Sequence, residues 1–175
     1  MAARTDVSDR VLPEQEERAS TAVYTEGLLA GVGGAVTVAA WFLLLDTIAG
    51  HPFYTPSLLG TALVRHGTEI AAPETLPVNM EMVVNFTWMH LLAFMVIGLA
   101  ASKLLEQAER DPNLGFGILL LFVVFEFGFI AVFSNVASEV LEVISWPSIL
   151  VGNLLAAAVM GFVFWRRHPR LVIRP

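Results

Sequence analysis

Two ionisable side chains lie within long apolar stretches of the sequence: His90 in WMHLLAF and Glu126 in VVFEFGF. A charge at the centre of a bilayer costs about 2.5 to 3.5 kcal/mol on insertion scales, so such residues are typical of polar pairs and functional sites. If both stretches span a membrane, His90 lies about 10 Å and Glu126 about 17 Å from the outer ends of their helices, at 1.5 Å per residue. The similar depths predict a hydrogen bond between the two side chains.

The pair has two interpretations. It fixes the register of two helices, or it binds a cofactor: a quinone, or a haem or pigment metal held by the histidine. A haem with two histidine ligands needs a second histidine at facing depth, and no other predicted span contains one. The sequence itself requires no cofactor, so the choice between these interpretations stays open.

A second group of ligating residues, His51, His66 and Glu69, lies between the first two apolar stretches. In HGTE, the last two of these are three residues apart, which places them on one face if the segment is helical. A divalent metal site is one interpretation. The other is an acidic outer surface, which arises whenever basic residues are kept on the inner side of a membrane.

Motifs for enzymatic chemistry are missing from the sequence. It contains no phosphate-binding loop, no HExxH motif and no GxSxG motif. Without cysteine it has neither thiolate ligands nor a cysteine nucleophile. We therefore predict that the protein is not an enzyme.

The composition is that of an integral membrane protein. Of 175 residues, 56% are hydrophobic and 15% are charged, and the mean hydropathy is +0.69, whereas soluble domains contain about 25% charged residues. A net charge of −6 argues against a nucleic-acid partner. The bilayer is the expected partner.

The fold predicted is an all-α bundle of four transmembrane helices. A helix needs about 20 apolar residues to cross a bilayer, and four segments meet this requirement, at about 27–48, 83–104, 114–137 and 146–165. They form a membrane domain over 27–165. A charged cytoplasmic arm, 1–26, precedes it, an external loop covers 49–82, and a basic cytoplasmic tail occupies 166–175.

The orientation follows from the basic residues, which concentrate on the cytoplasmic side of membrane proteins. Every lysine and arginine except Arg65 lies before the first span, between the second and third, or after the fourth. Both termini are therefore predicted to be cytoplasmic.

Within the external loop, Thr55 and Pro56 resemble a cap and first turn. Leu58, Leu59, Ala62 and Leu63 then recur with helical spacing. This pattern predicts a short interfacial helix.

Small residues at four-residue spacing predict where the spans touch, because close backbone approach drives helix association in lipid. On the first span Asp46 shares the face of Ala35 and Ala39, and on the fourth span Asn153 lies over Ala157. Such polar residues connect helices. The predicted packing and polar positions are Gly27, Gly31, Ala35, Ala39, Asp46, Asn153, Ala157 and Gly161.

The segments DTIAGHPFYTPSLLG, WMHLLAFMVIG and GNLLAAAVMGFVFWRRHP resemble parts of uncharacterised small four-helix bacterial membrane proteins. The resemblance spans most of the chain and implies a location in the bacterial cytoplasmic (inner) membrane. It implies no activity and no catalytic residue.

Two functions are compatible with these features. The first is a non-catalytic accessory or scaffold subunit of a larger membrane complex, respiratory or photosynthetic, in which other integral membrane subunits are partners. It is favoured by the short chain and the small-residue contact faces. The alternative is a small ligand-binding or redox protein in which His90 and Glu126 hold haem, pigment, quinone or metal.

Overall fold

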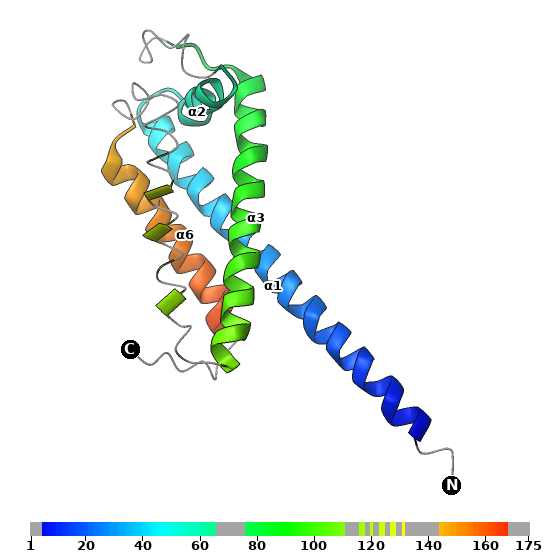
Figure 1. The fold of residues 1–175 in the computed structure, drawn as a ribbon. Coiled ribbons are helices and arrows are strands. Elements are labelled where there is room, and N and C mark those ends of the chain that lie inside the picture. The colour runs from blue at the N-terminus through cyan, green and yellow to red at the C-terminus, as the bar shows by residue number, and fades with distance from the viewer. Residues whose placement is uncertain are drawn as a thin grey trace.

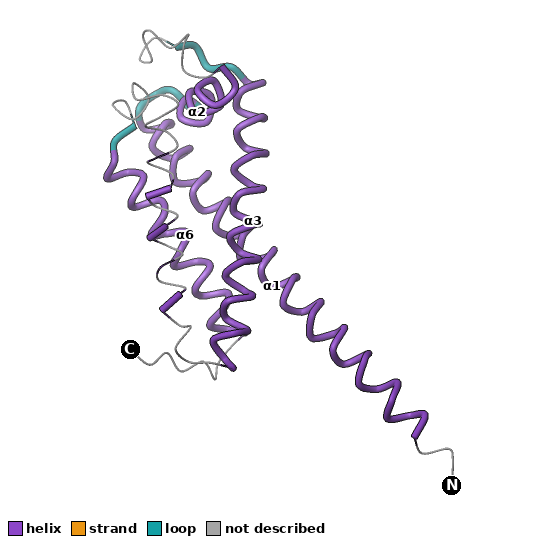
Figure 2. The backbone as a smooth tube through the Cα atoms, viewed as in Figure 1, coloured by secondary structure: helices purple, strands orange, loops and turns teal. Residues whose placement is uncertain are grey.

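A computed structural model describes residues 5–65, 76–110 and 144–167, with eight helical positions between 116 and 131; side chains at 5–20, 65 and 110 are outside this description. Its elements are α1 (Thr5–Ile48), α2 (Tyr54–Arg65), α3 (Met80–Arg110) and α6 (Trp146–Arg167). The described part of the chain is all-α, without strands (Figure 2).

Three of these helices are long and apolar enough to cross a membrane. They cover Thr21–Ile48, Met80–Glu109 and Trp146–Arg167, with 28, 30 and 22 residues. Large apolar side chains on them are exposed, among them Val36, Ile48 and Val96 at 60%, 75% and 66%. In water such surfaces promote association, whereas in a bilayer they face lipid. The chain is therefore a helical membrane protein.

The helix boundaries differ from the prediction mainly at the start of the chain. α1 begins at Thr5 rather than near residue 27, so most of the predicted arm is helical. Residues 14–26 contain no proline or glycine and begin EQEERA, residues with high helix propensity. This part of α1 projects beyond the other helices (Figure 1). α3 extends past both ends of the predicted 83–104, and α6 matches the predicted 146–165 closely.

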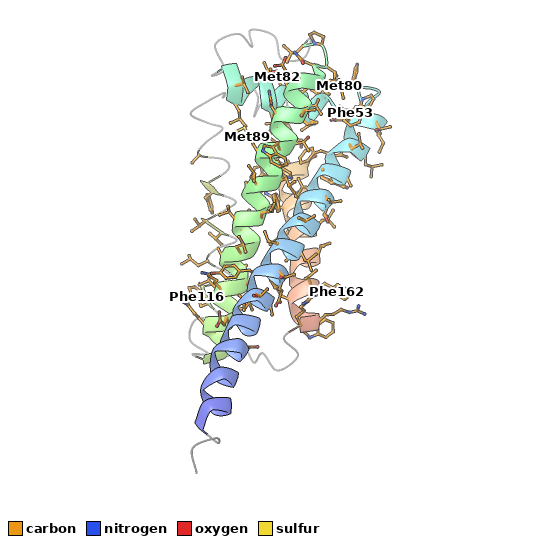
Figure 3. All side chains as sticks on the ribbon, turned by 90° about the vertical axis from the view of Figure 1, so that its right-hand side faces the viewer. Phe53, Met80, Met82, Met89, Phe116 and Phe162 are labelled. Carbon is orange, nitrogen blue, oxygen red and sulfur yellow. The ribbon has the colours of Figure 1, made fainter. Side chains whose placement is uncertain are left out.

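α1 runs antiparallel to α3 and α6, crosses α3 and also packs on α6 (Figure 1). α2 lies across one end of the bundle, beside the loops that connect the helices (Figure 2). Phe53, Met80 and Met82 mark this end, and Phe116 and Phe162 lie toward the opposite end (Figure 3). We call the end marked by Phe53, Met80 and Met82 the α2 end.

Glycines allow α1 and α3 to cross in close contact. A Cβ atom added to Gly31 would lie 2.8 Å from Met95 Cα, and one added to Gly98 would lie 2.7 Å from the Gly31 nitrogen. Gly27 faces the same segment of α3. Beyond the crossing, Ser102 Oγ donates a hydrogen bond of 2.8 Å to the Val23 carbonyl. Any side chain at these positions would prevent the two backbones from approaching so closely.

α6 packs on α1 through an aromatic side chain. Trp41 Nε1 donates a hydrogen bond of 2.9 Å to the Ser148 carbonyl, and a Cβ atom on Gly152 would lie 2.9 Å from Trp41 Cδ1. The indole ring therefore requires a glycine on the facing helix. The buried residues of α6 follow this contact: Ile149, Gly152, Ala156, Met160 and Phe164.

The buried stripe lies one position before the predicted packing face of α6. On the predicted face, Asn153 has a partner, Asn153 and Ala157 are half-buried, and Gly161 is exposed. The predicted face stays a prediction, because part of the chain that can pack on α6 lies outside the described residues. Gly161 makes no close helix contact within the described part of the chain.

The two glycine environments predict opposite effects of the same substitution. Gly98→Ala should destabilise the folded protein by about 1 to 3 kcal/mol because the added methyl group overlaps α1. Gly161→Ala should be neutral or stabilise it by up to about 1 kcal/mol, because alanine favours helix and no described residue lies within 4 Å of the added Cβ atom. Denaturant unfolding in detergent, followed by circular dichroism, measures both. Equal effects of the two substitutions would refute the close crossing.

Candidate functional site

An apolar cavity of about 430 Å³ lies among the four helices, and we call it the bundle cavity. Among the described residues its walls are mainly aliphatic and phenylalanine side chains, with four polar residues: Thr55, Thr87, His90 and Asn153. Val36 and Leu43, also in the wall, are 60% and 38% exposed and belong to the membrane-spanning part of α1. Part of the cavity wall is therefore formed by exposed residues of a helix long and apolar enough to span a membrane.

The cavity forms where α1 and α3 separate. Gly31 touches α3 and Ala35 is 3% exposed, but Ala39, one turn further along α1, is exposed and lines the cavity. The predicted contact face of α1 is thus continuous with the cavity wall. Ala39 contributes to this wall rather than to the close helix crossing because the helices diverge toward α2.

α2 closes the α2 end of the cavity and is held there by a buried carboxylate. Asp46, 6% exposed near the end of α1, accepts two hydrogen bonds from Thr55: 2.8 Å from the backbone nitrogen to Oδ2 and 2.6 Å from Oγ1 to Oδ1. The first satisfies an amide in the first turn of α2, which has no partner within its own helix. Asp46 therefore caps a helix other than its own.

This arrangement corrects the predicted role of Thr55. The sequence predicts that its hydroxyl caps the helix, but α2 begins one residue earlier and the hydroxyl donates to Asp46. The two oxygens of the Asp46 carboxyl group accept from both the amide and the hydroxyl of Thr55, which explains the exchange of roles. The chain reverses direction before α2 through Gly50 at φ +83° and Phe53 at φ +67°, so that Thr55 can reach Asp46.

The opposite side of α2 is fixed to the start of α3. Ser57, 1% exposed, accepts a hydrogen bond of 2.8 Å from the Asn79 nitrogen, and the Asn79 side chain in turn caps α3 by accepting from the Glu81 nitrogen at 2.9 Å. Gly60 lies against the Met82 backbone, where a Cβ atom would be 2.9 Å from the carbonyl carbon. α2 therefore packs tightly, with Leu58 and Ala62 fully buried.

His90 lies in the cavity wall between two phenylalanines of its own helix. The ring centroids of Phe86 and Phe94 are 5.6 Å and 4.7 Å from its imidazole ring. Its Nε2 atom lies 3.3 Å from the Ala35 carbonyl oxygen on α1. Because a carbonyl oxygen can only accept, Nε2 carries the hydrogen of this bond. His90 therefore connects α3 to α1 at the point where the two helices separate.

Of the remaining predicted site residues, the structure describes only His51. Glu126, His66 and Glu69 lie outside the described residues, so the His90 to Glu126 pair and the metal site stay predictions. His51 is exposed in the turn before α2, with its ring centroid 6.4 Å from that of Tyr54. Within the described ranges, no three potential ligands gather to hold a metal ion.

Sequence reasoning missed several residues that build the site. Gly98 and Ser102 both contact α1 and are four residues apart, which is the small-residue spacing recognised on α1 but not sought on α3. Thr87 lines the cavity because it lies one turn before His90. No sequence signal indicates that Ser57 bonds the start of α3, since that contact depends on how α2 is placed.

Comparison of the chain with protein-family models, curated proteins and solved structures gives no match. What the described residues define is a class: a helical membrane protein that contains an apolar cavity of ligand size, closed at one end by a short helix.

We expect the contact between Asp46 and Thr55 to be a main determinant of stability at the α2 end. Asp46→Ala should destabilise the protein by about 2 to 3 kcal/mol, because two buried donors lose their acceptor. Thr55→Val should cost less, about 1 kcal/mol, since its backbone nitrogen still reaches Asp46. The control is Thr47→Val, at an exposed position of α1 next to Asp46. Unfolding in detergent measures all three, and an effect of Asp46→Ala no larger than that of Thr47→Val would contradict this expectation.

Proposed function

We propose that this chain is a multi-pass protein of the bacterial cytoplasmic membrane that binds a lipid-soluble small molecule in the bundle cavity. The observation that carries the proposal is the cavity itself. Ligand sites typically occupy about 300 to 1,000 Å³, are mainly apolar and contain a few polar groups. The bundle cavity, with about 430 Å³ and four polar residues in its wall, meets each of these criteria.

The exposed part of the cavity wall supports a ligand that arrives through the bilayer. Val36 and Leu43 belong to the spanning part of α1, and both are exposed. At the α2 end, access is narrowed by Leu58 and Leu59, which are buried in a cluster with Ile144 and Ile149. A molecule dissolved in lipid therefore has a shorter route into the cavity than one dissolved in water.

His90 has one ring nitrogen left for a ligand. Nε2 is directed at the Ala35 carbonyl, and the ring lies between Phe86 and Phe94. A histidine that binds a metal commonly donates its other N–H to a carbonyl in this way, and the same Nδ1 atom can instead accept a hydrogen bond. The proposal therefore defines the ligand by its solubility in lipid.

A fourth span and cytoplasmic termini are part of the proposal. α3 ends at one end of the bundle and α6 begins at the other (Figure 1), so the intervening chain has to pass between them. Helical residues described there, among them Phe116, Val124 and Phe127, are 70%, 58% and 67% exposed, as expected of a lipid-facing helix.

Residues at the two ends of the bundle support the orientation. Exposed Trp146 and Trp165 stand at the ends of α6, about 28 Å apart at 1.5 Å per residue, close to the thickness of a bilayer core. Lys103 Nζ lies 4.9 Å from the centre of the Tyr24 ring, and Arg166 Cζ lies 5.0 Å from that of Phe162. Such aromatic and basic groups anchor helices at membrane interfaces.

A second function is favoured by the N-terminal part of α1. This helix continues from Thr5 and projects beyond the other described helices (Figure 1). The projecting sequence is charged and mixed in sign, and so suits a polar partner surface outside the bilayer. The protein would then be an accessory subunit of a larger membrane complex, and ligand binding in the cavity is compatible with that role.

Native mass spectrometry of the protein extracted from its membrane in mild detergent tests both functions. For ligand binding, we expect a small discrete mass above 19.1 kDa that Ala39→Phe removes, because the new ring fills the cavity. Ala158→Phe, at an exposed α6 position outside the cavity wall, should retain it. An excess mass due only to phospholipid, and unchanged by Ala39→Phe, would refute ligand binding. Companion chains in all three samples would support the accessory role, and a lone chain would refute it.

The proposed orientation predicts different labelling of two single-cysteine variants. The chain contains no cysteine, so Ser8→Cys and Ser145→Cys each introduce one thiol. In spheroplasts, a membrane-impermeant maleimide should label Ser145→Cys but not Ser8→Cys, since positions 8 and 145 lie on opposite sides. Detergent treatment should make both reactive. Labelling of Ser8→Cys in intact spheroplasts would reverse the assignment of sides.

A further inference from the structure

The polar groups in the wall of the bundle cavity differ in what they offer a ligand. A hydroxyl group has one hydrogen to donate and two lone pairs that accept, and a neutral imidazole has one nitrogen of each kind. Which of these remains available depends on the bonds already formed within the protein. For three of the four polar residues, those bonds are defined.

In each of these three residues the hydrogen is already donated within the protein. Thr87 Oγ1 donates to the Val83 carbonyl at 2.7 Å, and Thr55 Oγ1 donates to Asp46 at 2.6 Å. His90 Nε2 is directed at the Ala35 carbonyl at 3.3 Å. Two of these acceptors are backbone carbonyls, which carry no hydrogen to donate, and the third is the Asp46 side-chain oxygen that accepts from Thr55.

The atoms left to a ligand are therefore acceptors. The two threonine oxygens retain lone pairs, and the neutral form of His90 that donates from Nε2 has an acceptor at Nδ1. A ligand carbonyl or ether oxygen would find no matching hydrogen on these groups. A ligand hydroxyl would find an oxygen or nitrogen able to accept. The fourth polar residue, Asn153, already has a partner, but its amide carries both donor and acceptor atoms.

The apolar part of the wall indicates the shape of the ligand. Phe42, Phe53, Phe86 and Phe94 all line the cavity. Aromatic side chains pack best against other flat rings, in offset or edge-to-face contact. An aromatic ring therefore matches this wall better than a saturated chain.

We infer that the bundle cavity selects lipid-soluble aromatic molecules that carry a hydroxyl group, phenols in the broad sense, over the corresponding ketones and ethers. This inference rests on the proposed function, since it specifies the chemistry of the ligand in the same cavity. Thr87 is the specificity-determining residue most accessible to test. Its hydroxyl bonds only within its own helix, so replacing it does not disturb the contact that holds α2.

Three fluorescent probes of similar size test the inference: naphthol, methoxynaphthalene and acetylnaphthalene. Binding to the full-length protein in nanodiscs is measured by equilibrium dialysis, with empty nanodiscs to subtract partitioning into lipid. Naphthol should bind about fivefold or more tightly than either other probe, the factor expected for one net hydrogen bond. Thr87→Val should remove this preference without weakening the binding of methoxynaphthalene. The matched control is Thr37→Val, which loses an equivalent hydroxyl on α1, bonded to the Gly33 carbonyl outside the cavity wall.

The outcomes separate failure of the inference from failure of the proposed function. Equal binding of the three probes, or a preference for acetylnaphthalene, would overturn the selection of phenols if Ala39→Phe still abolished binding. A preference for acetylnaphthalene that Asn153→Leu removes would assign the polar contact to that amide instead. If no probe binds above the empty nanodiscs, or if Ala39→Phe changes nothing, the proposed function fails and the inference fails with it.

Discussion

The close crossing of α1 and α3 is the contact on which the rest of the structure depends. Gly31 and Gly98 bring the two backbones so near that a Cβ atom at either position would overlap the other helix. In lipid, helices gain little from burying apolar surface, so tight backbone packing supplies much of their association. Two straight helices that meet closely at one point and cross at an angle must separate on either side of it. On one side of the crossing, α2 lies across the end of the bundle (Figure 1). The bundle cavity lies on the same side, lined by residues of α1, α2, α3 and α6.

α2 can occupy that position because its polar ends are satisfied within the protein. Asp46 accepts from the first turn of α2, and Ser57 accepts from the residue before α3. A short helix in apolar surroundings would otherwise leave backbone groups without partners, at a cost of several kcal/mol each. The intramembrane carboxylate of α1 thus has a structural role. It caps the helix that closes the cavity, and it occupies the hydroxyl hydrogen of Thr55.

The hydrogen bonds formed within the cavity wall link the structure to the proposed function. In an apolar wall each hydroxyl and imidazole hydrogen needs an acceptor, and here helix carbonyls and Asp46 provide it. These donors have partners even without a ligand, yet the same side chains retain lone pairs that can accept a hydrogen bond. Of these groups, the two threonines and His90 favour a ligand that donates a hydrogen bond over one that accepts. Selectivity then follows from the bonds that stabilise the fold, without a charged group or a metal ion.

The sequence by itself determined the class of protein and several of its boundaries. Apolar length predicted the three membrane-spanning helices that the structure describes, since a helix must match the bilayer, and α6 begins and ends close to its predicted limits. Helical spacing of Leu58, Leu59 and Ala62 identified α2, and all three are buried. These features are local, because each depends only on neighbours along the chain.

Only the tertiary structure decided how these elements combine. It made Asp46, rather than Thr55, the cap of α2, and it placed Gly152 of α6 against the Trp41 ring, where a Cβ atom would lie too close. It also separated two roles within one stripe of small residues, placing Gly31 at the crossing and Ala39 in the cavity wall. Spacing along a helix gives the direction of a side chain, but contact depends on where the partner helix lies. That position is set by packing between segments distant in sequence, which no local pattern contains.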